Sequence, residues 1–167
     1  ALDTKIHSRR DVKKTLPEIP FVGEIPNAGA IEDAVIRKND FSGFAEAFRI
    51  MLTNIKFLIN DKKEGETTVI MVSSSIKGEG KTTISTNTAL ALAQNRKVLL
   101  IGADLRNPQL KKFTSHTKRG LSDFLASKQA ETSLDSFIQT SNLNPNLDIL
   151  PSGSIPPNPT YLLSNAN

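Results

Sequence analysis

The residues best suited to chemistry form one glycine-rich segment, Ser73-Ser-Ser-Ile-Lys-Gly-Glu-Gly-Lys-Thr-Thr83. It matches the phosphate-loop pattern G-x-x-x-x-G-K-[ST], except that Ser75 occupies the position of the first glycine. Gly78 and Gly80 allow positive φ angles and a close approach of the backbone to a ligand, because they lack a Cβ atom. The amides of such a loop can surround phosphate oxygens, so the segment predicts a phosphate-binding loop.

Two side chains at the end of this segment favour a nucleotide. Lys81 supplies a full positive charge to the terminal phosphates, and the Thr82 hydroxyl is placed to ligate Mg²⁺. The helix expected after the loop adds the partial positive charge of its N-terminus. The alternative is a glycine-rich turn with an exposed lysine, which leaves the strand expected before the loop and the helix after it unexplained. The predicted nucleotide-binding residues are Ser75, Lys77, Gly78, Glu79, Gly80, Lys81, Thr82 and Thr83.

An acidic residue follows the next apolar run, in Leu99-Leu-Ile-Gly-Ala-Asp-Leu-Arg-Asn-Pro108. Phosphoryl transfer needs a carboxylate for Mg²⁺ or for the attacking hydroxyl. Ligands of open parallel sheets bind at the carboxyl ends of the strands. We therefore predict that Asp104 lies beside the phosphate site as a catalytic residue and metal ligand. Alternatively, Asp104 is a turn residue or caps a helix near Pro108. Arg106 either pairs with Asp104 or contacts a phosphate.

The elements that would position these residues follow from apolar patterning. Thr68–Val72, Lys97–Ile101 and Leu147–Leu150 are apolar or β-branched runs typical of buried strands. Between the first two, residues 82–94 are rich in Ala and Leu and predict a helix. Apolar residues at three- and four-residue steps predict a longer helix over residues 42–60.

Shorter elements are expected elsewhere in the chain. Ser8 can cap a short helix that ends at Leu16-Pro17. The other short elements expected are a strand over Phe21–Ile25, loops over 27–39 and 61–66, and helices over 120–125, 133–138 and from 160.

The predicted fold class is α/β. Two apolar strands joined by a helix form a βαβ unit, which favours a mostly parallel sheet with helices on both faces. This sheet is expected to be small and incomplete at the C-terminus.

The composition excludes several classes of protein. The chain has 167 residues and no cysteine, which excludes a disulfide framework, a cysteine-based zinc site and a thiol nucleophile. Its longest apolar runs are about five residues, against ~18 for a membrane span. Ala1–Arg10 shows no signal peptide. His7 and His116 lack metal-ligand spacing.

The charge is moderately basic, with 21 Lys and Arg against 17 Asp and Glu, a net +4. Most basic residues are scattered and few aromatic residues accompany them, so we interpret them as a solvated face and expect no nucleic-acid partner. One cluster in the first fourteen residues differs, because it contains Lys5, Arg9, Arg10, Lys13 and Lys14. Such a cluster suits a segment near a negatively charged cytoplasmic leaflet.

The loop and the Asp104 segment, in this order and spacing, resemble the bacterial tyrosine kinases of capsule and exopolysaccharide biosynthesis. That family combines a Walker A loop with a Walker A′ strand, and it belongs to the MinD/ParA-like P-loop proteins. Residues 1–26 look like the family's segment after the second transmembrane helix of a chain-length regulator. Residues 46–54 look like its N-terminal helix, and residues 151–163 like its stretch ahead of Walker B.

The similarity covers nearly the whole chain and implies a division into two parts. Residues 1–39 would be a juxtamembrane linker with an N-terminal strand, and residues 40–167 the N-terminal part of a P-loop kinase domain.

The chain departs from the family pattern at several positions. The first aspartate of the family's A′ motif falls at Gly102. The oligomerisation pattern Glu-x-x-Arg-x-x-Arg is met by Glu46 and Arg49, which are therefore candidate oligomer contacts, but Leu52 takes its last place. The extra lysine of MinD/ParA loops falls at Ile76.

Two family elements are not found in the sequence. No apolar run ends in Asp-[Ser/Thr]-Pro-Pro, the Walker B pattern, and Tyr161 is the only tyrosine, where the family has a tyrosine cluster. We therefore interpret the chain as the first part of a kinase domain and expect it to be nearly inactive alone, because a Walker B carboxylate supports Mg²⁺ binding.

The resemblance implies a tyrosine autokinase domain that uses ATP and Mg²⁺ and regulates polysaccharide polymerisation and export. Lys81 and the loop amides would hold the β- and γ-phosphates, Thr82 and Asp104 would organise Mg²⁺, and Asp104 is a candidate base for the tyrosine hydroxyl. The implied partners are further copies of the protein, whose tyrosines are the substrate, the export machinery and a cognate tyrosine phosphatase. The parent protein would lie at the cytoplasmic face of the cell membrane, and this chain itself would be soluble.

Two other functions remain open from the sequence. A MinD/ParA-like ATPase shares the loop, although Ile76 in place of the extra lysine disfavours it. A non-catalytic nucleotide-binding scaffold is favoured by Gly102 and by the missing acidic motif.

Overall fold

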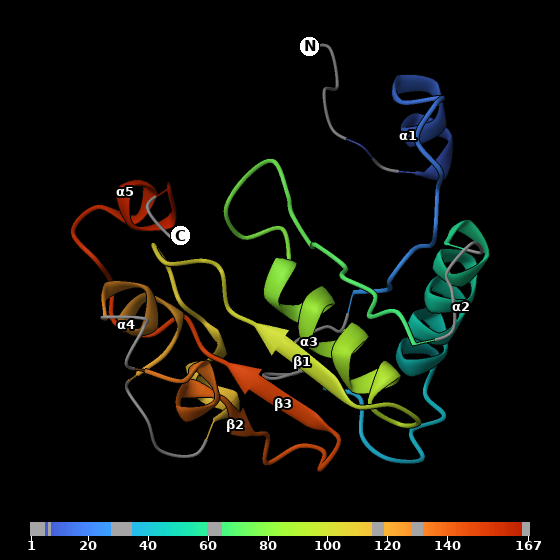
Figure 1. Cartoon of the computed structure of the whole chain (residues 1–167). Helices are drawn as coiled ribbons and strands as arrows, with labels where there is room; N and C mark the ends of the chain where they lie inside the picture. The colour runs from blue at the N-terminus through green and yellow to red at the C-terminus, as the bar shows by residue number, and fades with distance from the viewer. Residues whose placement is uncertain are drawn as a thin grey trace. The chain divides into compact units, whose positions relative to one another are not determined.

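The computed structural model describes residues 6, 8–27, 35–59, 65–114, 119–127 and 132–164 (Figure 1). The expectations for Lys5, His7 and His116 and for most of the loops at 27–39 and 61–66 lie outside these residues. The chain divides into two compact units, one of Ala1–Glu32 with Asp40–Ile70 and one of Asp33–Asn39 with Met71–Asn167. None of the described helices is long and apolar enough to cross a membrane.

The first unit contains two capped helices, as predicted. In α1 (Arg9–Thr15) the Ser8 hydroxyl accepts from the Asp11 N–H, and in α2 (Gly43–Leu58) the Ser42 hydroxyl accepts from the Ala45 N–H. These bonds satisfy amides that have no partner inside the helix. α2 buries one apolar face, on which the rings of Phe44 and Phe48 meet edge to face at 5.1 Å.

The strand predicted for Phe21–Ile25 is wrong. The segment is extended but pairs with no strand among the described residues. Instead, Gly23 packs closely against Met51, and the Asn54 side-chain amide donates to the Val22 carbonyl at 2.9 Å. Side chains of α2 therefore supply the contacts that a neighbouring strand would otherwise supply.

The second unit contains a sheet of three strands in the order β1-β3-β2, with β1 (Val98–Ile101), β2 (Gln139–Thr140) and β3 (Leu147–Leu150). β1 and β3 are parallel, in the register Val98 to Leu147, which confirms the strands predicted there. β2 and β3 are antiparallel, so the sheet is mixed, and the prediction of a mostly parallel sheet holds for the β1–β3 pair but not for the short strand β2. The short connection between β2 and β3 explains the difference, because a parallel pair needs a crossover of about a dozen residues or more.

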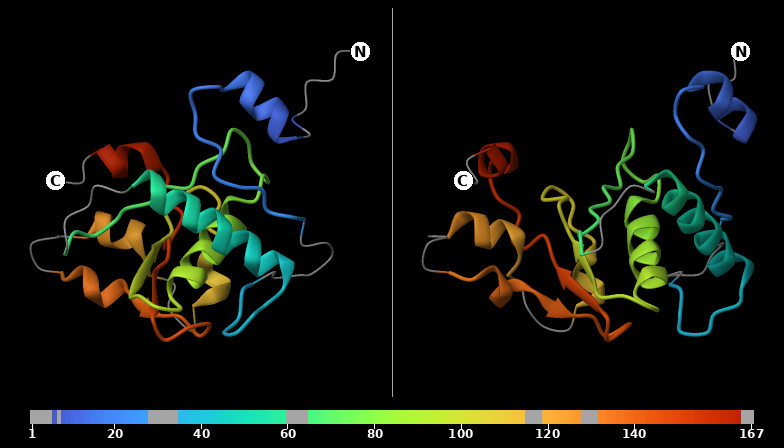
Figure 2. Two further views of the ribbon diagram at one scale, coloured as in Figure 1. Left: turned by 90° about the vertical axis from the view of Figure 1, so that its right-hand side faces the viewer. Right: turned by 45° about the vertical axis from the view of Figure 1, so that its right-hand side comes forward.

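Helices flank this sheet. α3 (Lys81–Leu92) packs against β1, and Figure 2 shows it on one side of the strands with α4 (Leu121–Ala126) on the other. α3 is buried around most of its surface, and its Asn87 side chain accepts from the Ile36 N–H at 2.7 Å. The remaining elements are 3-10 helices at Leu110–Phe113 and Leu134–Phe137 and the helix α5 (Pro159–Ser164).

The strand predicted for Thr68–Val72 is also wrong. The run is not one of the three strands, and Val69 and Met71 are 88% and 87% exposed. A β-branched run becomes a strand only where another edge pairs with its backbone, because β propensity largely reflects cross-strand packing. α3 and β1 therefore form as expected, whereas the first strand of the predicted βαβ unit does not.

The carboxyl ends of β1 and β3 meet in a close backbone contact. The Gly102 N–H donates to the Leu150 carbonyl at 2.8 Å, and the N–H groups of Leu121 and Ser122 donate to the Pro151 and Ser152 carbonyls. A Cβ atom at position 102 would lie 2.7 Å from the Ser152 Oγ and 2.9 Å from its backbone nitrogen. The packing therefore requires a glycine there for lack of space.

Replacing Gly102 by Ala should destabilise the chain by about 1–3 kcal/mol, the usual cost of overpacking a close contact. The matched control is Gly43→Ala at the start of α2, where a Cβ atom would meet nothing within 4 Å. That control should leave stability unchanged or raise it by up to about 1 kcal/mol, because alanine favours the helix. Urea unfolding followed by circular dichroism measures both changes, and equal effects of the two substitutions would contradict the packing argument.

Candidate nucleotide-binding site

The predicted phosphate loop leads directly into α3. Gly78 and Gly80 have φ angles of 93° and 91°, in the left-handed region that side chains rarely adopt. A Cβ atom at either position would meet nothing within 4 Å. The two glycines are therefore required for their conformation, and they leave open space beside the loop.

The amino end of α3 carries amides with no side-chain cap. Gly80 is the N-cap residue, and the first backbone bond inside the helix runs from the Ile84 N–H to the Gly80 carbonyl at 2.9 Å. The N–H groups of Lys81, Thr82 and Thr83 precede that bond, so they have no partner within the helix. Such an end attracts anions, because its amides and the helix dipole both present positive charge.

Lys81 closes the loop on itself. Its ammonium group donates to the Ser74 hydroxyl at 2.6 Å and to the Ile76 carbonyl at 3.1 Å. The Ser74 hydroxyl also donates to the Ile76 carbonyl at 2.9 Å. These bonds hold the positive charge against the start of the loop, next to the amino end of α3. Ser74 was not among the predicted site residues, and no spacing rule in the sequence identifies it.

Glu79 holds the same residue, Ile76, through the peptide on its other side. Its carboxylate accepts from the Ile76 N–H at 3.1 Å. This N–H holds the pKa of the Glu79 carboxyl below its usual range, with smaller contributions from Ser74 and Lys81. The carboxylate accepts a hydrogen bond from the loop backbone, so its negative charge is held at the Ile76 N–H.

The predicted acidic element lies at the same end of the unit. Figure 1 shows the amino end of α3 and the carboxyl ends of β1 and β3 pointing to the same side. Asp104 follows β1 and is exposed, and one carboxylate oxygen accepts from the N–H groups of Arg106 and Asn107 at 3.2 and 2.9 Å. The turn role weighed for Asp104 is therefore observed, and none of its recorded hydrogen bonds reaches the loop. Arg106 is exposed, and its side chain forms no ion pair with Asp104 in the described part of the chain.

Asp123 is a structural residue at this end that the sequence analysis missed. Its carboxylate accepts from the Gly120 N–H at 2.8 Å and the Ser154 N–H at 3.1 Å, so it joins the start of α4 to the turn after β3. Partial burial raises the pKa of Asp123, but hydrogen bonds from Gly120 and Ser154 and the Arg119 charge outweigh it and lower that pKa. The spacing of Gly120 and Asp123 is that of a capping box, which was the available signal.

The residues that the structure describes do not form a preformed metal centre. Among the described residues, no group of three or more His, Asp or Glu side chains could hold a metal ion. Thr82 lies in the first turn of α3 and Asp104 in the turn after β1. This donor set of one hydroxyl and one carboxylate fits Mg²⁺ that arrives with phosphate ligands, because Mg²⁺ usually takes only one or two protein carboxylates there.

The remaining predicted residues are two in the loop and two on α2. Ser75 and Lys77 are exposed in the loop. Glu46 and Arg49 form an ion pair on α2 at 2.8 Å, and the Arg49 guanidinium also donates to the Asp40 carbonyl and lies 5.9 Å from the Phe41 ring centre. The candidate oligomer contacts are thus already paired within the first unit.

The loop bond of Glu79 predicts a pH-dependent signal. The pKa of Glu79 is lowered, so its stabilising contribution is present at neutral pH and is lost as the pH falls through that lowered value. The Ile76 amide proton should therefore shift on acidification, with a midpoint below the ordinary glutamate value of about 4.3. NMR titration measures this. Glu79→Gln should abolish the transition and Glu66→Gln should preserve it, and an unchanged titration in Glu79→Gln would disprove the contact.

Comparison with known proteins identifies relatives by sequence, although no protein-family model matches the chain. The tyrosine-protein kinase YwqD of Bacillus subtilis is 41% identical over 123 residues, which are 72% of this chain and 49% of that protein. The tyrosine-protein kinase CpsD of Streptococcus agalactiae is 41% identical over 125 residues, which are 72% and 50%. The chain thus spans about half the length of these relatives.

Solved structures agree with the sequence comparison. The chimerical protein CapA2B2 superposes with a TM-score of 0.75 at 30% identity, over 95% of this chain and 66% of that one. The kinase domain of the Escherichia coli tyrosine kinase ETK superposes with a TM-score of 0.74 at 26% identity, over 95% and 65%. These matches confirm the P-loop fold predicted from the loop. By sequence and by structure, the chain is homologous to these kinase domains and belongs to the bacterial tyrosine kinase family.

Proposed function

We propose that the chain binds ATP as the nucleotide-binding part of a tyrosine autokinase that regulates capsule or exopolysaccharide polymerisation and export. The observation that carries this proposal is the uncapped amino end of α3 behind two left-handed glycines, with Lys81 held beside it. Kinase relatives support the reaction class.

Different loop residues would make different contacts to the bound phosphates. The amides at the start of α3 donate to phosphate oxygens, and Gly78 and Gly80 keep the approach free of side chains. Lys81 exchanges its bonds to Ser74 and Ile76 for the β- and γ-phosphates, so that its charge follows the terminal phosphates. Glu79 keeps its bond to the Ile76 N–H and so limits rearrangement of the loop.

Thr82 and Asp104 would bind the metal ion, and Asp104 would also act on the acceptor hydroxyl. The Thr82 hydroxyl and the Asp104 carboxylate would hold Mg²⁺, which neutralises charge on the transferring phosphate when it is bound. Asp104 would also accept the proton of the attacking tyrosine hydroxyl. One Asp104 oxygen already accepts two backbone N–H groups, which orient the carboxylate.

The acceptor, the partners and the location of the parent protein are proposed from what the family implies. The acceptor would be tyrosines of a neighbouring copy, through contacts that include Glu46 and Arg49, and a tyrosine phosphatase would reverse the reaction. The parent protein would act at the cytoplasmic face of the cell membrane, with the polysaccharide polymerisation and export machinery as its partner. Arg106 would approach a phosphate, because Asp104 does not engage its side chain in the described residues.

A non-catalytic nucleotide-binding scaffold is the second candidate. Two observations favour it. The Asp104 carboxylate accepts hydrogen bonds within its own turn, and position 102 has no space for a side chain. An aspartate at that position could not be accommodated without moving Ser152. This alternative keeps nucleotide binding but removes phosphate transfer.

Nucleotide binding is tested by calorimetric titration of Mg-ATP and Mg-ADP. We expect micromolar affinity for the unaltered chain and a loss of about 10- to 100-fold in Lys81→Ala, the usual effect of removing a charge-assisted hydrogen bond. The matched control is Lys56→Ala, which removes an exposed lysine of α2 and should bind as tightly as the unaltered chain. Equal affinity of Lys81→Ala and the unaltered chain would refute the phosphate site.

Phosphate transfer is tested separately with γ-labelled ATP and a tyrosine-rich peptide. The chain alone should transfer almost no label. A fusion to the part of the Bacillus subtilis relative that this chain does not match should transfer label, and Lys81→Ala or Asp104→Asn should reduce this at least about 100-fold. Nucleotide binding without transfer in the fusion would support the scaffold. ATP hydrolysis without phosphotyrosine would instead support a MinD/ParA-like ATPase.

A further inference from the structure

The helix α1 carries an uneven distribution of charge. Its four basic residues Arg9, Arg10, Lys13 and Lys14 are all exposed. Since successive residues of a helix are about 100° apart, these four cover a continuous arc of about 140°. Asp11 lies outside that arc.

Apolar side chains border the same arc. Val12 adjoins it within the helix, and Leu16 adjoins it directly after the helix ends. Leu16, Ile19 and Ile6 are 45%, 57% and 60% exposed. Exposed apolar side chains beside a basic arc are typical of helices that lie in a membrane interface.

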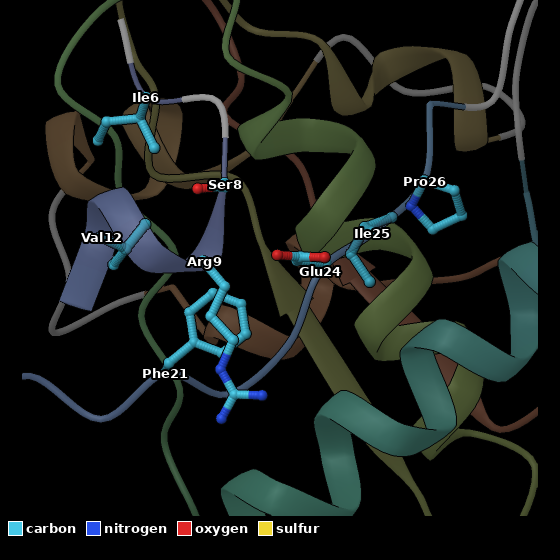
Figure 3. Close-up of a pocket in the computed structure, with 8 residues that line it drawn as sticks. All are labelled: Ile6, Ser8, Arg9, Val12, Phe21, Glu24, Ile25 and Pro26. Atoms are coloured by element: carbon cyan, nitrogen blue, oxygen red, sulfur yellow. The ribbon is translucent and has the colours of Figure 1, made fainter.

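An open hollow of about 500 Å³ continues this surface (Figure 3). Figure 3 shows Ile6 and Val12 on one side of it and Ile25 and Pro26 on the other. The Arg9 guanidinium lies 5.0 Å from the centre of the Phe21 ring, so the arginine is anchored at the hollow through a cation–π contact. The hollow is lined mostly by apolar side chains, and its polar members are Ser8, Arg9 and Glu24, so the excess of positive charge comes from the helix and not from the hollow.

Within the part of the chain that the structure describes, no side chain of α1 is buried. The helix has seven residues, whereas isolated helices shorter than about 12 residues are marginal in water. Arg9 and Lys13, and likewise Arg10 and Lys14, are like charges four residues apart, which destabilises a helix slightly. A dense anionic surface would remove this repulsion and would cover the apolar border.

We propose that α1 and the adjoining hollow form a binding surface for an anionic phospholipid bilayer. The four basic residues attract the headgroups, and Val12, Leu16 and Ile19 enter the interface between headgroups and acyl chains. A nucleic acid fits this surface less well, because the basic residues of the helix have no aromatic side chain among them on which bases could stack, and the Phe21 ring is covered by Arg9. The proposal does not depend on kinase activity.

The experiment measures co-sedimentation of the whole chain with vesicles of phosphatidylcholine alone or with 30 mol% (about one lipid in three) phosphatidylglycerol. We expect binding only to the anionic vesicles, falling as salt rises from about 0.05 to 0.5 M. Replacing Arg9, Arg10, Lys13 and Lys14 together by Gln should weaken it at least about 50-fold, since each basic residue near such a surface contributes a factor of about five. Leu16→Ser should weaken the vesicle binding that remains at the highest salt concentration, because that binding comes from apolar contacts.

The control replaces four exposed basic residues elsewhere by Gln, namely Arg37, Lys38, Lys56 and Arg96, and so changes the net charge equally. It should bind vesicles as the unaltered chain does. An equal loss in both quadruple variants would show an effect of net charge only and would overturn the proposal. Tighter binding to a single-stranded oligonucleotide than to the vesicles, lost in the α1 variant, would overturn it in favour of a nucleic-acid surface. Circular dichroism checks that each variant keeps its fold.

Discussion

α3 begins at Gly80 without a side-chain cap, so the first amides of the helix are left to bind solvent or a ligand. The left-handed glycines bring the chain into α3 from a direction that leaves these amides open. Lys81 binds the carbonyl of Ile76 and Glu79 binds its N–H, so both peptides around Ile76 are held and the open end does not collapse. The phosphate site therefore depends on a loop that is braced by its own charged side chains.

The rest of the second unit holds α3 and the turn after β1 in place. α3 lies against β1, and the turn after β1 is packed so closely against Ser152 that only a glycine fits at position 102. Asp123 ties α4 to the same region through two backbone N–H groups. The position of Asp104 is thus determined by contacts on the far side of its own turn, and the chemistry proposed for it rests on backbone packing as much as on its charge.

Much of the local structure could be predicted from the residues. The apolar periodicity of 42–60 and the Ala- and Leu-rich run after Lys81 both predict helices that the structure contains. Ser8 acts as the cap expected of it, and Ser42 caps the helix that was expected to begin there. These successes share a cause, because a helix and its cap are formed by hydrogen bonds within a few residues of one another.

The sequence by itself determined the loop, its glycine conformations and the helices around it, since each depends on neighbours along the chain. The tertiary structure alone decided which apolar runs become strands. Lys97–Ile101 and Leu147–Leu150 found partners, whereas Thr68–Val72, which is richer in β-branched residues than either, is not part of the sheet. It also decided that Asp104 turns to its own backbone. Strand pairing and side-chain direction depend on residues distant in the chain, which composition and spacing do not record.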